Sequence, residues 1–395
     1  TFAAQLMYPM VDTYEVMPWP DRIYQGLYRI AGTDQKERIP RSYSTQMQTM
    51  VNTLNDIRTS DKKITGTHGI GVLMANSLMF QRFPNHNGYD DPQFSSFYGQ
   101  TLPLLKRGIP VELVHMENTP FKETFKELHI LVMSYSNMKP MEPEYHNYLA
   151  DWVKKGGVLI YCGEDVDPYQ TVLEWWNTEG NEYKAPSEHL FEQMNLSRNP
   201  GEGTYHYGKG TVIVMREDPK HFVLKAGNDQ KYFEAIASAY RKKLGKAIET
   251  KNNFIVERGP YTIAAVMDES VSEEPLTLSG LYIDLFDKDL PVLTSKQIQP
   301  GEQGYLYDLN KVSGKVKAKV LCGASRIYDE KVGKRSYSFV AKSPINTTNV
   351  SRVLLPCKPE KVQVNGKEEQ PEWDESSKTL LLSFENDPAG VNVSI

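Results

Sequence analysis

The chain has 395 residues, 39% hydrophobic and 24% charged, a composition typical of a globular protein with two or three domains. Its 45 basic and 50 acidic side chains give a formal net charge of −5, which is not the basic balance of a nucleic-acid-binding surface. No apolar run approaches the roughly 20 residues that cross a bilayer. We therefore expect no nucleic-acid partner and no membrane partner.

The first 66 residues predict a strand and a helix. Tyr14 to Met17 predicts a short strand, because Pro18 and Pro20 stop regular structure directly after it. The later segment SYSTQMQTMVNTLNDI predicts a helix. Its apolar residues at helical spacing are Met47, Met50, Val51, Leu54 and Ile57. The predicted strand and helix would together form one βα unit of a larger α/β domain, with no partner strand before it in the sequence.

Residues 67–247 alternate apolar runs of strand length with longer helical patterns, which is typical of a βαβ parallel sheet. The predicted strands are 69–75, 110–115, 129–134, 157–162 and 211–215. The predicted helices are about 93–107, 143–155, 168–176 and 229–244. Right-handed crossovers would assemble these elements into an open, mostly parallel sheet.

Residues 248–395 contain short β-rich runs separated by Gly, Pro, Asn and Asp turns, including the hairpin signal Asn365-Gly366. Helical periodicity is absent from this part of the sequence. An antiparallel β-sandwich is the architecture that this pattern predicts. The fold class is therefore α/β plus all-β.

Several segments carry a family likeness. They are YEVMPWPDRIY, PLLKRGIPVELVHME, YLADWVKKGGVLIYCGE, ERGPYTIAAVMDES, GLYIDLFDKDLPVL and LPCKPEKVQVNGK. With them the chain resembles the C-terminal half of large bacterial glycoside hydrolases of the β-galactosidase type. The resemblance implies the end of a TIM barrel at 1–66. It also implies a flavodoxin-like trimerisation domain of the class I glutamine-amidotransferase-like fold at 67–247, and a β-sandwich at 248–395.

The resemblance implies a non-catalytic region that acts in carbohydrate degradation, binds carbohydrate and forms a homo-oligomer, in a periplasmic or secreted protein. A glycosidase needs two carboxylates that flank the scissile bond. In barrels of this type the pair would lie before Thr1, so we expect this chain alone to be inactive. The start at Thr1, without methionine or a signal pattern, leads us to expect that an upstream segment was removed.

Two alternatives remain open. One is a stand-alone carbohydrate-binding or scaffolding protein, and the other is an amidotransferase-like hydrolase that uses Cys162. That cysteine follows a predicted strand, but YCGED lacks the G-x-C-x-G elbow of a strained nucleophile, which favours a buried structural cysteine. With Cys322 and Cys357 it forms neither a CxxC metal motif nor a disulfide framework. We predict no metal site and no cofactor.

The loop after the first predicted strand is the candidate substrate-binding site. Barrel enzymes place such residues at the carboxyl ends of strands. The candidates are Tyr14, Glu15, Trp19 and Arg22, with Trp19 stacking on a sugar ring and Glu15 accepting hydrogen bonds from hydroxyl groups. In the alternative interpretation, Glu15 pairs with Arg22 and Trp19 packs under the loop.

Polar loops after two strands of the α/β region are further candidates. Ligands bind at that edge of a parallel sheet. The residues concerned are His86, Asp90, Asp91, Asp165 and Asp167. These loops also consist of ordinary turn-forming residues, and that is the interpretation the sequence favours.

Overall fold

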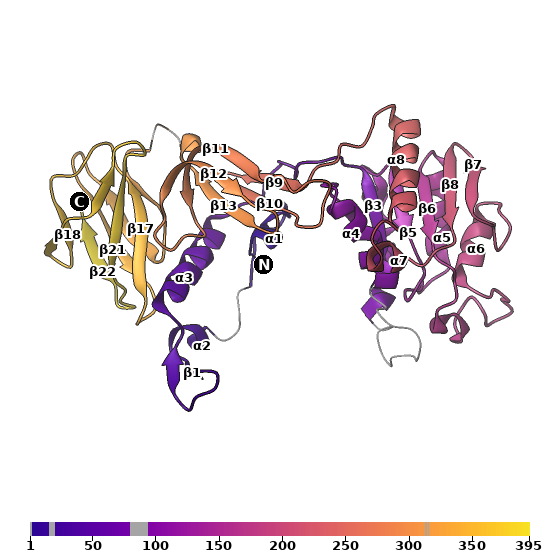
Figure 1. The fold of residues 1–395 in the computed structure, drawn as a ribbon, viewed down its shortest axis with the longest axis horizontal. Helices are drawn as coiled ribbons and strands as arrows, with labels where there is room; N and C mark the ends of the chain where they lie inside the picture. Colours follow the sequence, from indigo (N-terminus) through magenta and orange to yellow (C-terminus); the bar gives the residue numbers. More distant parts are fainter. Residues whose placement is uncertain (1, 16–19, 80–93, 313, 315) are drawn as a thin grey trace. The chain divides into compact units, whose positions relative to one another are not determined.

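A computed structural model describes the chain except for residues 1, 16–19, 80–93, 313 and 315 (Figure 1). The chain forms two compact units. Unit 1 comprises Thr1–Ile64, Asn253–Asp268 and Glu273–Ile395, and unit 2 comprises Thr65–Asn252 and Glu269–Ser272. Unit 2 is therefore an insertion within unit 1. The chain begins in unit 1, then forms most of unit 2, and then returns to unit 1.

Unit 2 is built on a six-stranded sheet with the order β4-β3-β5-β6-β8-β7. Its strands are β3 (Ile70–Met74), β4 (Glu112–His115), β5 (Ile130–Met133), β6 (Val158–Cys162), β7 (Gly203–Tyr207) and β8 (Gly210–Met215). Strand β7 is antiparallel to β8, and the other five strands are parallel. All five predicted strands of this region are confirmed. In chain order the parallel strands run 2-1-3-4-5, an order found in doubly wound sheets.

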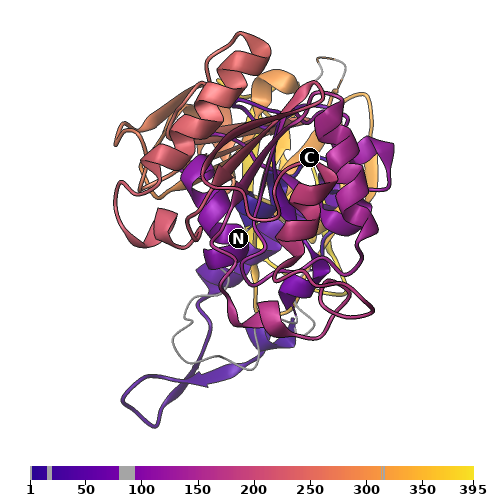
Figure 2. The ribbon, with the colours of Figure 1, turned by 90° about the vertical axis from the view of Figure 1, so that its right-hand side faces the viewer.

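Helices cover both faces of this sheet (Figure 2). The helices are α4 (Gly99–Leu105), α5 (Glu144–Lys154), α6 (Pro186–Gln193), α7 (His221–Leu224) and α8 (Gln230–Leu244). Residues of α5 and α6 share one buried cluster with the sheet, and residues of α4, α7 and α8 share the other. The helix α6 was not predicted from the sequence.

The helix predicted at 168–176 is wrong, since only a 3-10 turn forms there, at Pro168–Thr171. The Asp167 carboxylate accepts a hydrogen bond from the Tyr169 amide at the start of the turn. Farther along, the indole N–H groups of Trp175 and Trp176 donate to the backbone carbonyls of Pro140 and Gln170. Side-chain anchoring to neighbouring loops therefore overrides the local helical pattern.

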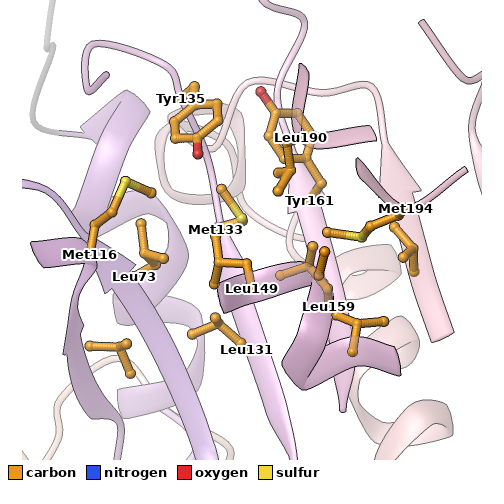
Figure 3. Packing of buried hydrophobic residues seen from close by; sticks show 14 of the residues in the cluster. Leu73, Met116, Leu131, Met133, Tyr135, Leu149, Leu159, Tyr161, Leu190 and Met194 are labelled. Carbon is orange, nitrogen blue, oxygen red and sulfur yellow. The ribbon is translucent and has the colours of Figure 1, made fainter. Parts of the chain in front are cut away.

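Alternate side chains along the strands of unit 2 point to the same face of the sheet and form its hydrophobic core. Leu131 and Met133 of β5, and Leu159 and Tyr161 of β6, point to the face covered by α5 and α6 (Figure 3). Leu149 of α5 packs against them from the helical layer. Each such side chain is fully buried, which contributes about 1.5–3 kcal/mol.

In the described residues of 253–395, unit 1 contains three antiparallel sheets where the sequence predicted a single sandwich. The first has the order β12-β11-β13-β10-β9. Its strands are β9 (Asn253–Arg258), β10 (Tyr261–Val266), β11 (Leu276–Asp284), β12 (Val292–Ile298) and β13 (Gln303–Asp308). The prediction of antiparallel β structure in this region is confirmed.

The other two sheets share one core and form a sandwich. One sheet has the order β14-β17-β21-β20, with β14 (Lys319–Gly323), β17 (Thr348–Leu354), β20 (Glu372–Asp374) and β21 (Thr379–Glu385). Its partner has the order β15-β16-β22-β18-β19, with β15 (Arg326–Val332), β16 (Tyr337–Lys342), β18 (Val362–Val364), β19 (Lys367–Glu369) and β22 (Val391–Ser394).

The N-terminal segment contributes α1 (Phe2–Leu6), α2 (Asp21–Tyr24), an exposed hairpin of β1 (Leu27–Arg29) and β2 (Lys36–Arg38), and α3 (Arg41–Asp56). The predicted helix is confirmed as α3. Residues 11–15 form neither helix nor strand, so the strand predicted from Tyr14 is absent from its described half. None of the described helices is long and apolar enough to cross a membrane.

Helix α3 lies against strands that come far later in the chain. Met50, Leu54 and Ile57 are buried in one cluster with Val256 of β9 and Ile263 of β10. Helix α3 also contacts β17, where the Thr45 hydroxyl donates to the carbonyl of Thr348. The first 64 residues thus share a hydrophobic core with the β-rich part of unit 1.

Candidate functional site

Tyr14, the first of the predicted substrate-binding residues, is part of an internal hydrogen-bond network. Its hydroxyl donates to the Val11 carbonyl at 2.7 Å and accepts from the Arg258 guanidinium at 2.7 Å. Arg258 is 1% exposed and also donates to the carbonyls of Leu6 and Arg58. This network explains why residues 11–15 follow an irregular path around a buried cation instead of forming a strand.

The other predicted residues are not brought to a common point by a contact that the structure describes. Glu15 is exposed at the end of the irregular segment, and Trp19 lies outside the described residues. Arg22 is an exposed residue of α2, and its backbone carbonyl accepts a hydrogen bond from the Tyr28 hydroxyl at 2.6 Å. A sugar-binding role for the four residues stays a prediction.

A cavity of about 450 Å³ lies in unit 1 beside α3. Helix α3 supplies Asn52, Thr53, Asn55 and Asp56, and Tyr261 comes from β10. The remaining lining residues belong to 319–328, which includes β14 and the start of β15. Within this lining the Asn52 amide donates to the Gly323 carbonyl at 3.0 Å, and the Asn52 Oδ1 atom has no partner among the described residues.

Burial shapes the chemistry of this first cavity. The Tyr261 hydroxyl donates to the Asp56 carboxylate at 2.8 Å, and burial together with this carboxylate raises the pKa of Tyr261 well above its ordinary value. Burial also raises the pKa of the Cys322 thiol to about 12. Both groups stay protonated at neutral pH, so neither the Tyr261 hydroxyl nor the Cys322 thiol is an activated nucleophile.

A second cavity, of about 580 Å³, adjoins the first. The two share Arg326 and Tyr328 of β15 as lining residues. The second is also lined by residues of α2 and α3, and by Lys342, whose ammonium lies 5.4 Å from the centre of the Tyr328 ring. We call the two together the α3 cavities.

The α3 cavities combine an exposed aromatic ring with amide, carboxylate and cationic side chains. Their volumes fall in the range of about 300–1,000 Å³ that is typical of small-molecule sites. Tyr328 is 44% exposed, which leaves its ring accessible to a ligand. This site was not predicted from the sequence. The sequence does contain one indication of it. Asn52, Asn55 and Asp56 are polar residues at positions i, i+3 and i+4, so they lie on one face of a helix.

In unit 2 the predicted aspartates lie at the carboxyl edge of the sheet, and each is bound internally. Asp167 forms a buried ion pair with Lys139 at 2.6 Å, with side chains that are 1% and 2% exposed. Asp165 pairs with Arg216 at 2.8 Å and accepts a hydrogen bond from Ser187 at 2.8 Å. Their partners use the carboxylate oxygens, so these residues organise loops. His86, Asp90 and Asp91 lie outside the described residues.

Two histidines extend this polar cluster. The Nδ1 atoms of His146 and His189 are 2.8 Å apart, and the Tyr135 hydroxyl lies 2.6 Å from Nε2 of His146. Burial lowers the pKa of His146 well below 6.5 and also lowers the pKa of His189. Asn137 follows Tyr135 by two residues in the sequence. It is 1% exposed, and its side-chain amide has no hydrogen-bond partner among the described residues.

Cys162 lies at the end of β6 and is fully buried in the apolar cluster beneath α8. Burial raises the pKa of its thiol far above the ordinary value. A nucleophilic cysteine requires an accessible thiolate with a lowered pKa. The environment of Cys162 therefore matches the buried structural cysteine that the YCGED segment favours.

No family model matches this chain, and no curated protein matches it. Solved structures do match. A β-galactosidase from Bacillus circulans sp. alkalophilus is 10% identical, with a TM-score of 0.38 over 67% of this chain and 43% of its own. A catalytic mutant of a GH42 β-galactosidase from G. stearothermophilus is 12% identical, with a TM-score of 0.34 over 66% of this chain and 42% of its own.

A rhamnosidase from Novosphingobium sp. PP1Y is 10% identical, with a TM-score of 0.32 over 88% of this chain and 36% of its own. All three similar structures are glycoside hydrolases, and the chain spans less than half the length of each.

Proposed function

We propose that this chain is a carbohydrate-binding, non-catalytic region of a glycoside hydrolase, and that the α3 cavities hold the sugar. The observation that carries the proposal is the pair of adjoining cavities lined by Tyr328, Asn52 and other polar side chains. Sugar rings present an apolar face and a rim of hydroxyl groups, so they require an aromatic surface beside hydrogen-bonding groups. The family resemblance of the sequence supports the same class of ligand.

The wider organisation belongs to the same proposal. The strand order 2-1-3-4-5 supports a flavodoxin-like assignment for the region 67–247. A barrel-end segment at 1–66, a sandwich region at 248–395 and self-association come from the resemblance alone. Light scattering that finds a monomer at every concentration would contradict the self-association.

Binding measured by calorimetry against a panel of neutral and charged oligosaccharides tests the function. Replacing Tyr328 by Ala removes the exposed ring, and we expect it to weaken saccharide binding roughly tenfold. Tyr148→Ala is the matched control, because Tyr148 of α5 has a similar exposure of 42% and lies in unit 2. The proposal fails if no saccharide binds, or if Tyr328→Ala binds as tightly as the unchanged chain.

A further inference from the structure

Three basic side chains line the α3 cavities. Lys319 faces the first cavity, Lys342 faces the second, and Arg326 faces both. Within the part of the chain that the structure describes, none of the three forms an ion pair with a carboxylate. Other lysines of unit 1 do form such pairs, for example Lys296 with Asp284 at 2.7 Å. The α3 cavities therefore gather three basic side chains that form no ion pair with any described carboxylate.

Two of these cations are placed directly opposite each other. In the antiparallel pair β15–β16, Arg326 is the register partner of Lys342. Like charges at directly opposite positions destabilise a sheet. Tyr328 follows Arg326 by two residues, so it projects from the same face of the strand. The sheet thus holds a repulsive cationic pair next to an accessible aromatic ring.

The acidic residues of the lining compensate this charge only in part. Asp56 lines the first cavity and is bound by the Tyr261 hydroxyl, and Asp21 lines the second. Three basic side chains against two acidic ones leave the α3 cavities with an excess of one positive charge. The whole chain has a formal net charge of −5, so the local sign is opposite to that of the molecule.

We infer that the α3 cavities bind an acidic saccharide whose anionic group lies between Arg326 and Lys342 while a sugar ring contacts Tyr328. This inference rests on the proposed function and narrows it to one class of ligand. A guanidinium binds a carboxylate or a sulfate through two parallel hydrogen bonds, and charge-assisted bonds are about twice as strong as neutral ones. The anion would also relieve the repulsion between the two cations.

Calorimetry with charge-matched ligands tests the inference at an ionic strength of about 0.15 M, where distant charges are screened. Tetragalacturonate is compared with its methyl ester, which keeps the same ring skeleton without the charge. Galactose 6-sulfate is compared with galactose, which separates a sulfate group from a carboxylate as the source of the anion. Sodium sulfate alone serves as the probe for a simple anion site.

Replacing Arg326 by Gln removes the charge that both cavities share. We expect the Kd for the acidic ligand to rise about tenfold, while the Kd for its uncharged counterpart stays unchanged. Lys331→Gln is the matched control, because Lys331 lies on the same strand outside both cavities.

The unfolding temperature in the absence of ligand provides a second measurement. Arg326→Gln should raise the unfolding temperature, since it removes the repulsion with Lys342. Replacing a residue that is needed for folding would lower it.

The outcomes separate this inference from the function on which it rests. Equal binding of tetragalacturonate and its methyl ester would overturn the acidic specificity and leave carbohydrate binding in place. Binding of neither saccharide would overturn both. Sulfate ions that bind as tightly as the acidic saccharides would indicate a simple anion site and overturn the inference. Preference for one of the two acidic ligands would support it and identify the anionic group.

Discussion

Two clusters of charged side chains, one in each unit, differ in whether their charges are paired. In unit 2, Lys139 and Asp167 are buried as an ion pair, and Arg216 is bound to Asp165. In unit 1, Arg326 and Lys342 lie opposite each other beside open cavities, with no carboxylate paired to either in the described part of the chain. Charges that are neutralised internally hold loops in place. Charges that form no ion pair with a carboxylate at a cavity are available to an anionic ligand.

The largest expected effect concerns the buried pair of unit 2. Replacing Lys139 by Met leaves the Asp167 carboxylate buried without its cation, which should destabilise the fold by about 3–5 kcal/mol. Burial lowers the pKa of Lys139, with Asp167 acting in the opposite direction, so the carboxylate is the main group that keeps this lysine charged. Urea unfolding followed by far-UV circular dichroism measures the change.

Two further variants control this experiment. Lys155→Met breaks the exposed pair with Asp151, where both side chains are more than half exposed, and should cost at most about 1 kcal/mol. Replacing Lys139 and Asp167 together by Met and Leu removes both charges and should recover much of the loss. A single Lys139→Met variant as stable as the parent would mean that unit 2 does not depend on this pair.

A smaller loss is expected in unit 1. Leu54 of α3 is 6% exposed and packs in the cluster with strands β9 and β10, so Leu54→Ala should cost about 3 kcal/mol. Hydrogen exchange should show that β10 and β13 lose protection while β5 and β6 keep theirs. Tyr43→Ala, at a 48% exposed position of the same helix, should change little. Equal loss of protection in both units would show that they unfold together.

The histidine pair gives unit 2 a stability that depends on pH near neutrality, and the sequence of unit 1 contains no histidine. Burial is the main reason that the pKa values of His146 and His189 are lowered, although Glu192 and Glu144 raise that of His189. Both rings are neutral in the folded state, and the unfolded chain takes up protons near pH 6.5. The two histidines therefore make their full contribution to the free energy of unfolding above pH 6.5. As the pH falls below this value, the free energy of unfolding decreases by up to about 1.4 kcal/mol per pH unit for each proton that the unfolded chain takes up.

Urea midpoints between pH 7.5 and 5.5 measure this dependence. We expect His146→Gln to flatten it, because one titrating group is removed. His206→Gln, at an exposed position of β7, should leave it unchanged. A flat profile for the parent chain would contradict neutral buried histidines.

The strands of unit 2 were predicted well from the hydrophobic pattern, because each parallel strand is one continuous apolar run in the sequence. Strands such as VLIYC are buried along their whole length, which is the pattern of a sheet covered on both faces. The turn at Pro168–Thr171 was mistaken for a helix because its conformation depends on Asp167 and two tryptophans that bind loop carbonyls. Such side-chain anchors leave no period in the sequence.

The candidate site was beyond prediction for a different reason. Asn52 and Arg326 are separated by more than half of the chain, and the register between β15 and β16 decides that Arg326 faces Lys342. The helix α3 itself was predicted, but its partner strands were not, because nothing in a local pattern encodes which distant strands cover it. The loop at Tyr14 was misjudged because Arg258, which organises it, comes from β9.

The insertion of unit 2 within unit 1 has a consequence for synthesis on the ribosome. The ends of unit 2 meet where the Glu249 amide donates to the Thr67 hydroxyl at 3.0 Å, so this unit can close as soon as it has emerged. Helix α3 must wait for strands that begin only at Asn253, which takes on the order of 10–40 s at ordinary elongation rates. During that interval the apolar face of α3 has no strand to cover it, which makes the nascent chain a natural client for chaperones.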